Sequence, residues 1–232
     1  MKKLTLLALL MSSIAIGQED KNKNDHDHNH QHEHGNEHNG GANHYMHQSS
    51  MDELVERFES KERDKYQQPE KVLEYLGDIN GKKIMDIGAG TGYFSVKLAA
   101  KGANVIAADV SDDFQNYLKK RIKEEGISNI ELRKLPYDSP ELEKNEVDKV
   151  LIVNTYHHIE DRIAYFKKVR KGINSEGELV IIDFFKAELP VGPPVGHKIA
   201  VDEVVLELKK AGFTEFIVEL SLLDYQYIIR AK

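Results

Sequence analysis

The 232-residue chain contains no cysteine. It therefore has no disulfide framework, no cysteine-ligated metal site and no thiol nucleophile. An excess of positive charge is also absent, because 39 acidic residues outnumber 32 basic ones and give a formal net charge of −7. Proteins that bind nucleic acid usually present a basic face, so this balance argues against a nucleic-acid partner.

The apolar run near the N-terminus, residues 4–16, is too short to cross a bilayer as a helix, which takes roughly 20 residues. It follows a short basic start and ends at small residues, Ala15 and Gly17, spaced as signal peptidase requires. These features are typical of a secretory signal peptide. We expect cleavage after Gly17 and export to the periplasm or the outside of the cell, with no membrane span left; an uncleaved anchor is the alternative.

A histidine-rich stretch follows the predicted signal peptide. Residues 18–50 contain almost no aliphatic side chains, which predicts a disordered linker. Alternate residues of an extended chain share one face, and imidazole suits Zn, Ni and Cu. Either the stretch binds such metals adventitiously, or metal binding is its function. The candidate metal ligands are His26, His28, His30, His32 and His34.

Residues 51–232 are predicted to form one α/β domain, because strand patterns alternate with helix patterns. Two helices, over 51–60 and 69–76, precede a doubly wound, Rossmann-like sheet of five parallel strands. The last two strands are too close for a crossover helix, so we expect an antiparallel C-terminal hairpin. The predicted strands are 83–87, 104–108, 130–135, 147–153, 178–182, 214–220 and 226–230; the later helices are 93–100, 112–125, 162–171 and 201–210.

The most informative motif is a glycine-rich turn that follows the first predicted strand and opens a helix. Glycine adopts positive φ readily and lets a ligand lie against bare backbone. The start of a helix also offers unpaired N–H groups to an anion. The turn therefore predicts a site for an anionic group of a cofactor. Its sequence is Asp86-Ile87-Gly88-Ala89-Gly90-Thr91-Gly92.

The glycine spacing distinguishes between cofactor classes. A dinucleotide fingerprint reads Gly-x-Gly-x-x-Gly. This chain has Gly-x-Gly-x-Gly, with Tyr93 in the place of the third glycine of the fingerprint, and no Walker lysine follows. Asp109 comes at the end of the second predicted strand, where its carboxylate can accept hydrogen bonds from both hydroxyls of a ribose.

Taken together, this turn and Asp109 resemble motifs I and II of class I S-adenosylmethionine (SAM)-dependent methyltransferases. Asp148 and Gly177 match later landmarks of that group, and the resemblance covers residues 70–232. It implies the class I methyltransferase type of Rossmann-like fold, with SAM as cofactor. The turn and Asp86 would hold the methionine part of SAM, and Asp109 its ribose. The candidate cofactor residues are Asp86, Gly88, Ala89, Gly90, Thr91, Gly92, Asp109 and Asn154.

An acceptor pocket is expected where the fourth strand ends, because ligands of open parallel sheets gather at the carboxyl ends of the strands. Methyl transfer needs an aligned nucleophile, exclusion of water and, for some acceptors, removal of a proton. His157 and His158 follow this strand and titrate near neutrality, which makes them the candidate catalytic residues. We favour His158, which is nearer the next helix; a purely structural role for both is the alternative.

Two functions fit these features. The first is transfer of a methyl group from SAM to an unidentified small-molecule acceptor. Arsenite methylation is excluded because it needs thiols, and C-methylation of a quinone-type acceptor is open by analogy only. The second is an exported metal-binding protein whose SAM-type domain is inactive or repurposed. The histidine-rich stretch supports the second function. The predicted signal peptide conflicts with the SAM motif, since SAM is made and kept in the cytoplasm, and the sequence leaves this conflict open.

Overall fold

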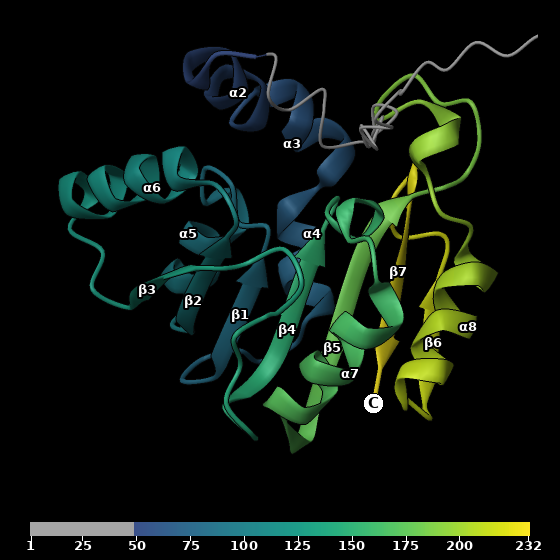
Figure 1. Ribbon diagram of the computed structural model, residues 1–232. Coiled ribbons are helices and arrows are strands. Elements are labelled where there is room, and N and C mark those ends of the chain that lie inside the picture. Colours follow the sequence, from purple (N-terminus) through teal and green to yellow (C-terminus); the bar gives the residue numbers. More distant parts are fainter. Residues whose placement is uncertain (1–48) are drawn as a thin grey trace, which may run out of the picture. The chain divides into compact units, whose positions relative to one another are not determined.

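The computed structural model describes residues 49–232 (Figure 1). The predicted signal peptide (1–17), the predicted linker as far as residue 48 and the five candidate metal-ligating histidines lie outside the described residues. Those assignments therefore stay predictions from the sequence. The last two residues of the predicted linker are described, and Ser50 begins the folded domain as the cap of its first helix.

Short helices precede the sheet. Ser50 caps α2 (Met51–Phe58) in a reciprocal capping box, in which its hydroxyl accepts from the Glu53 N–H at 3.3 Å and the Glu53 carboxylate accepts from the Ser50 N–H at 2.8 Å. The helix α3 (Lys61–Gln67) was not predicted, because its sequence is polar throughout and has no apolar periodicity. Pro69 then opens α4 (Pro69–Tyr75), as predicted.

The sheet has seven strands in the order β3-β2-β1-β4-β5-β7-β6. The first five strands are parallel, β7 pairs antiparallel with β5, and β6 pairs antiparallel with β7. The predicted five parallel strands and terminal hairpin are thus confirmed. The strands are β1 (Lys83–Ile87), β2 (Asn104–Asp109), β3 (Ile130–Lys134), β4 (Val147–Val153), β5 (Ile173–Phe184), β6 (Phe216–Glu219) and β7 (Gln226–Ala231).

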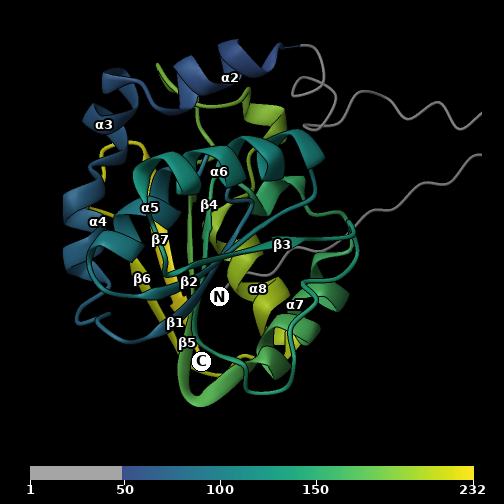
Figure 2. The ribbon, with the colours of Figure 1, turned by 90° about the vertical axis from the view of Figure 1, so that its left-hand side faces the viewer.

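Helices cover both faces of this sheet (Figure 2). The buried residues of α4, α5 and α6 pack with one set of alternating strand residues, and those of α7 and α8 pack with the other set. In β1, for example, Ile84 contributes to the first layer and Met85 to the second. The two cores explain why the central strands are apolar without interruption. The covering helices are α5 (Tyr93–Ala100), α6 (Asp112–Glu125), α7 (Arg162–Gly172) and α8 (Val201–Ala211).

The strand β5 starts at Ile173, five residues before the predicted start at Glu178. Its pairing with β4 shifts register between Val147 and Lys149, which lets the first part of the strand bend. Gly177 lies inside this irregular part, where a Cβ would come within 2.4 Å of the Asp148 carbonyl oxygen. The sequence alone did not reveal this extension, because residues 174–177 are polar and small.

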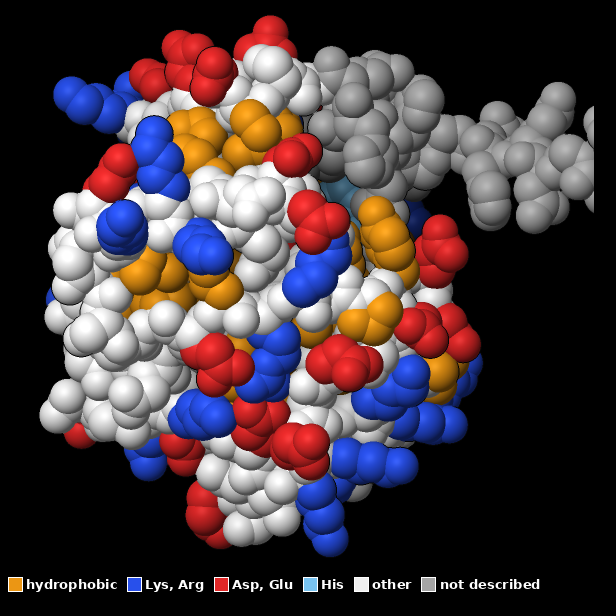
Figure 3. Space-filling view, turned by 60° about the vertical axis from the view of Figure 1, so that its left-hand side comes forward, with side chains coloured by type: hydrophobic (Ala, Val, Ile, Leu, Met, Phe, Trp, Pro, Cys, Tyr) orange, Lys and Arg blue, Asp and Glu red, His pale blue; other side chains and the backbone are white. Residues whose placement is uncertain are grey.

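On the face of the domain in Figure 3, acidic and basic side chains are interspersed with small apolar areas. None of the helices among residues 49–232 combines the length and the apolar character that a bilayer crossing requires.

Candidate functional site

The glycine-rich turn lies at the carboxyl edge of the sheet, where it joins β1 to α5. Gly88, Gly90 and Gly92 all have positive φ, of 77°, 55° and 85°. A Cβ at Gly88 would lie 2.3 Å from Oγ1 of Thr155, and one at Gly92 would lie 2.4 Å from Cδ1 of Leu118. Glycine is therefore required at both positions, for conformation and for space. The turn is packed tightly against the segment after β4 on one side and against α6 on the other.

Asp109, the last residue of β2, fixes this turn. One carboxylate oxygen accepts from the Gly90 N–H at 2.8 Å, and the other accepts from the Ser111 N–H at 2.8 Å. Burial raises the pKa of Asp109, and the hydrogen bonds from these backbone N–H groups oppose that rise. A carboxylate has about four acceptor positions, so Asp109 can bind a ligand hydroxyl while it holds the turn.

Asp86 lies in β1 just before the turn and is buried. The Ser95 hydroxyl, in the first turn of α5, donates to its carboxylate at 2.6 Å. Burial raises the pKa of Asp86 to about 6, although the hydrogen bond from Ser95 and the charge of Arg63 both act against the rise. The first strand and the helix after the turn are therefore joined by a carboxyl group whose ionisation depends on pH in the mildly acidic range.

This raised pKa makes stability depend on pH. The folded state binds the proton more tightly than the unfolded chain, where an aspartate has a pKa of 3.8. Ionisation of Asp86 therefore lowers the free energy of unfolding as the pH rises from about 4 through 6, by about 3 kcal/mol in all. Asp86→Asn keeps an acceptor for Ser95 and does not ionise. We expect its free energy of unfolding, measured relative to that of wild type, to increase by about 3 kcal/mol between pH 4 and pH 8.

Urea unfolding of both proteins at several pH values measures this difference. Asp113→Asn, which removes an exposed carboxylate from the first turn of α6, is the control for the loss of a charge. A difference between Asp86→Asn and wild type that stays constant with pH would contradict the assignment.

Arg63, from α3, is a site residue that the sequence analysis missed. Its guanidinium carbon lies 3.9 Å from the centroid of the Tyr93 ring, at the start of α5, and its Nη1 donates to the Phe58 carbonyl at 3.1 Å. Its Nε is buried and has no hydrogen-bond partner in the described part of the chain. A buried charged donor without a partner is costly, and an anionic ligand would satisfy it. Polar α3 gave no signal that could have placed Arg63 here.

The end of α2 lies over the turn. The Phe58 ring is 3.7 Å from the position of a Cβ on Gly90 and stacks on Phe114 of α6, with centroids 6.0 Å apart. Glu59 accepts from the Thr91 hydroxyl at 2.5 Å and from Nη1 of Arg121 at 2.9 Å. Residues 58–63 therefore form a cover over the glycine-rich turn, held by one stacked ring pair and one shared carboxylate.

The segment after β4 brings the two candidate catalytic histidines to the same edge of the sheet. It forms a short 3₁₀ helix, Tyr156–His158. Nδ1 of His157 lies 2.9 and 3.1 Å from the two carboxylate oxygens of Asp183, near the end of β5, and both side chains are almost fully buried. Asp183 also accepts from the Phe184 N–H at 2.8 Å. A buried carboxylate thus fixes the orientation of the His157 ring.

His158 has a different environment. Its ring centroid lies 4.3 Å from that of His157. Burial lowers the pKa of His158 to about 4, and the neighbouring His157 and His197 lower it further, against the charge of Asp183. His158 is therefore neutral at pH 7. The two histidines therefore differ in their surroundings, because the Asp183 carboxylate orients the His157 ring and burial dominates the environment of His158.

The remaining candidate cofactor residues are also at this edge. The Ala89 N–H donates to the Ala108 carbonyl of β2 at 3.0 Å, which ties the turn to the sheet. Asn154, which follows β4, has a φ of 56°, and its side chain is hydrogen bonded to Gln67 and Gln226. The structure therefore brings all eight candidate cofactor residues and both histidines to one edge of the sheet.

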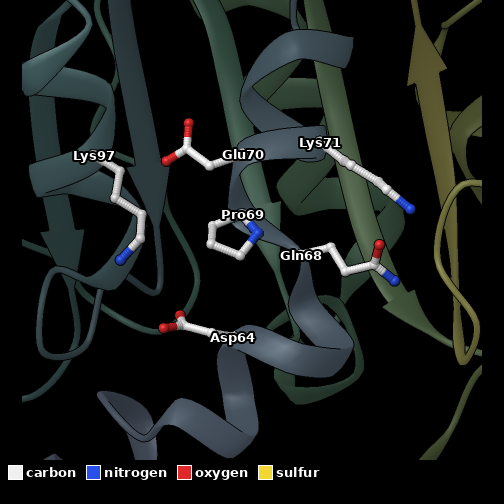
Figure 4. Close-up of a pocket in the computed structure, with 6 residues that line it drawn as sticks. All are labelled: Asp64, Gln68, Pro69, Glu70, Lys71 and Lys97. Carbon is white, nitrogen blue, oxygen red and sulfur yellow. The ribbon is translucent and has the colours of Figure 1, made fainter.

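A shallow depression of about 410 Å³ lies at the junction of α3 and α4 (Figure 4). Its lining includes none of the candidate site residues predicted from the sequence. One of its members, Asp64, accepts from the Tyr93 hydroxyl at 2.5 Å and so belongs to the packing of α3 on α5. Across residues 49–232, no group of three or more His, Asp or Glu side chains is arranged to hold a metal ion. The lining residues are Asp64, Gln68, Pro69, Glu70, Lys71 and Lys97.

Comparison with known proteins agrees with this arrangement. Residues 84–177 match the model of a methyltransferase domain. The chain is 26% identical over 109 residues to the ubiquinone biosynthesis O-methyltransferase of Acinetobacter baylyi, an alignment that covers 47% of this chain and 46% of that enzyme. The enzyme of the same name from Acinetobacter baumannii is 26% identical over 177 residues, with 68% of this chain and 74% of that enzyme covered.

A SAM-dependent methyltransferase from Aquifex aeolicus has a similar solved structure. It superposes with a TM-score of 0.73 at 25% sequence identity, over 79% of this chain and 98% of that one. The predicted Rossmann-like fold of the class I methyltransferase type is therefore confirmed. The matches support a SAM-dependent methyltransferase, and the chain spans about half the length of the A. baylyi relative.

Proposed function

We propose that the domain transfers a methyl group from SAM to a hydroxyl oxygen of a small-molecule acceptor. The observation that carries this proposal is the packed glycine-rich turn pinned by Asp109 at the carboxyl edge of the sheet. The similarity to enzymes named O-methyltransferases supports oxygen as the atom that receives the methyl group.

Three features of the site fit SAM. Gly90 has no side chain, and only the Phe58 ring lies within 4 Å of its Cβ position, so a ligand that displaces this ring can approach the backbone closely. Arg63 provides a buried cation with an unpaired Nε that a carboxylate, such as that of the methionine part, would satisfy. Asp109 keeps acceptor positions for the paired hydroxyls of a ribose. These three groups lie on different elements, α3, the turn and β2, which converge at one edge.

Bound SAM supplies an electrophilic methyl group, and the chain has to orient the acceptor, exclude water and take up a proton. Asp183 holds Nδ1 of His157, which leaves Nε2 as the atom that can accept the proton of the acceptor hydroxyl. The carboxylate of Asp183 then stabilises the imidazolium that forms. The new C–O bond would form as the O–H proton moves to Nε2 and as the bond between the methyl carbon and the SAM sulfur breaks, with SAH as the leaving group. Phe58 and the rest of the cover help to exclude water from the turn.

Calorimetry with S-adenosylhomocysteine (SAH), the demethylated product, tests this proposal. We expect wild type to bind SAH and Asp109→Ala to bind it at least tenfold more weakly, since each hydrogen bond to a charged group contributes about 1.5–3 kcal/mol. Asp113→Ala, which removes an exposed carboxylate four residues away, should bind like wild type. Well-folded wild type that binds neither SAM nor SAH would rule out the proposed function.

A further inference from the structure

Three carboxamide side chains form a closed ring of hydrogen bonds beside the candidate site. Nε2 of Gln67 donates to Oε1 of Gln226 at 3.0 Å, Nε2 of Gln226 donates to Oδ1 of Asn154 at 2.5 Å, and Nδ2 of Asn154 donates to Oε1 of Gln67 at 3.1 Å. Gln67 and Gln226 are completely buried. We call this set the amide ring. It joins three segments that are far apart in the sequence.

The amide ring behaves as a unit on physical grounds. Each member donates once and accepts once, so each buried carboxamide has a partner for both of its ends. Removal of one member leaves a donor on the second and an acceptor on the third without partners, and an unsatisfied buried polar group costs more than a formed hydrogen bond contributes. The loss of any one member therefore opens the ring and leaves only one of its three hydrogen bonds, which no longer joins all three segments.

Each member of the ring belongs to a segment that carries part of the site. Gln67 is the last residue of α3, one helical turn after Arg63. Asn154 precedes Thr155, which fills the space beside Gly88, and the 3₁₀ helix with His157. Gln226 begins β7, where it pairs with Phe184, the residue after Asp183.

The left-handed backbone of Asn154 strengthens this link. Its φ of 56° is uncommon for a residue other than glycine, although asparagine tolerates it best. The conformation turns the chain sharply after β4, and the two side-chain hydrogen bonds of the ring hold Asn154 in that turn. The direction in which Thr155 and His157 leave the sheet thus depends on the ring.

We propose that the amide ring is a positioning group for the methyl-transfer site. It fixes the position of Arg63 on α3 relative to the segment 154–158, so that Arg63, which would bind the carboxylate of SAM, and His157, which would take the proton of the acceptor, face the same site. The inference rests on the proposed function. Its three members are positioning residues and need not touch either ligand. An apolar trio could fill the same volume, but only directed hydrogen bonds select a single relative placement of the three segments.

The test uses two single variants and their combination in the full chain. Gln67→Met keeps the length of the side chain and removes its amide. Asn154→Gly removes the amide while the left-handed backbone is kept without strain. We expect each variant to bind SAH about tenfold more weakly than wild type. The double variant should be no weaker than either single one, because the first change already breaks the ring.

A control separates positioning from stability. Nδ2 of Asn129 donates to the carbonyls of Ala99 and Ala103, at 2.9 and 2.8 Å, away from the carboxyl edge. Asn129→Leu should lower the melting temperature at least as much as Gln67→Met, yet bind SAH like wild type at a temperature where all variants are folded. Asn154→Gly keeps the test decisive if Gln67→Met does not fold.

Two results would overturn the inference. If the ring variants fold and bind SAH like wild type, the ring has only a structural role. If the losses of SAH affinity in the two single variants add up in the double variant, the members act independently. Both results require that wild type binds SAH. A wild type without affinity for SAH would instead remove the proposed function and, with it, the basis of this inference.

Discussion

A valine in place of Gly90 should lower the affinity for SAH by more than a hundredfold, which is a loss of about 2.7 kcal/mol or more. Gly90 has a φ of 55°, a conformation that β-branched residues avoid. Its branches would also extend toward the Phe58 ring, which is already 3.7 Å from the Cβ position. The valine would thus fill the bare backbone surface on which the ligand is expected to lie, and would push the cover away from the turn.

The variant Gly77→Val is the matched control. Gly77 follows α4 with a φ of 75°, and a Cβ there would meet nothing within 4 Å. The control thus introduces a comparable backbone strain at a position without a ligand. It should lower the melting temperature as Gly90→Val does and leave the affinity for SAH unchanged. Equal affinities of Gly90→Val and wild type in calorimetry would show that the ligand does not approach this backbone.

Replacement of His157 by asparagine should reduce turnover by roughly a hundredfold or more, the usual contribution of a general base. The amide of asparagine can still donate to Asp183 from about the position of Nδ1, so the buried carboxylate keeps its partner. What is lost is Nε2, the proposed proton acceptor. Affinity for SAH should therefore change by no more than a few-fold, because donor binding does not involve that atom.

His158→Asn is the comparison for this prediction. The sequence favours His158 as the catalytic residue. We propose His157 instead, because Asp183 orients its ring, whereas burial holds the pKa of His158 at about 4 and so makes it a poor proton acceptor at neutral pH. We expect His158→Asn to retain most of its turnover. Transfer of labelled methyl from SAM into a metabolite extract provides the assay. Full turnover by His157→Asn would transfer the role of base to another residue.

The sequence was informative where local chemistry determines the structure. The glycine-rich turn was predicted at the right residues because positive φ and close packing leave glycine as the only choice at Gly88 and Gly92. The parallel strands were predicted because they are buried on both faces and are apolar throughout. Asp109 was placed correctly for the same local reason, since it ends such a strand and faces the turn.

The parts of the site that were missed depend on contacts between distant segments. Arg63 and Gln67 lie on a polar helix of seven residues, and no periodicity in that helix distinguishes buried side chains from exposed ones. The partner of Gln67 is 159 residues away in the sequence. The pairing of His157 with Asp183 likewise arises because β4 and β5 are neighbours in the sheet, which places the carboxyl ends of these two strands side by side.

The methyltransferase-domain match over residues 84–177 includes the glycine-rich turn, Asp109 and His157, but it excludes Arg63 on one flank and Asp183 on the other. A chimera that exchanged only this common core would inherit the turn without the cation above it, and a histidine without its carboxylate. Both flanks would therefore have to be transferred together with residues 84–177 for the proposed site to stay complete.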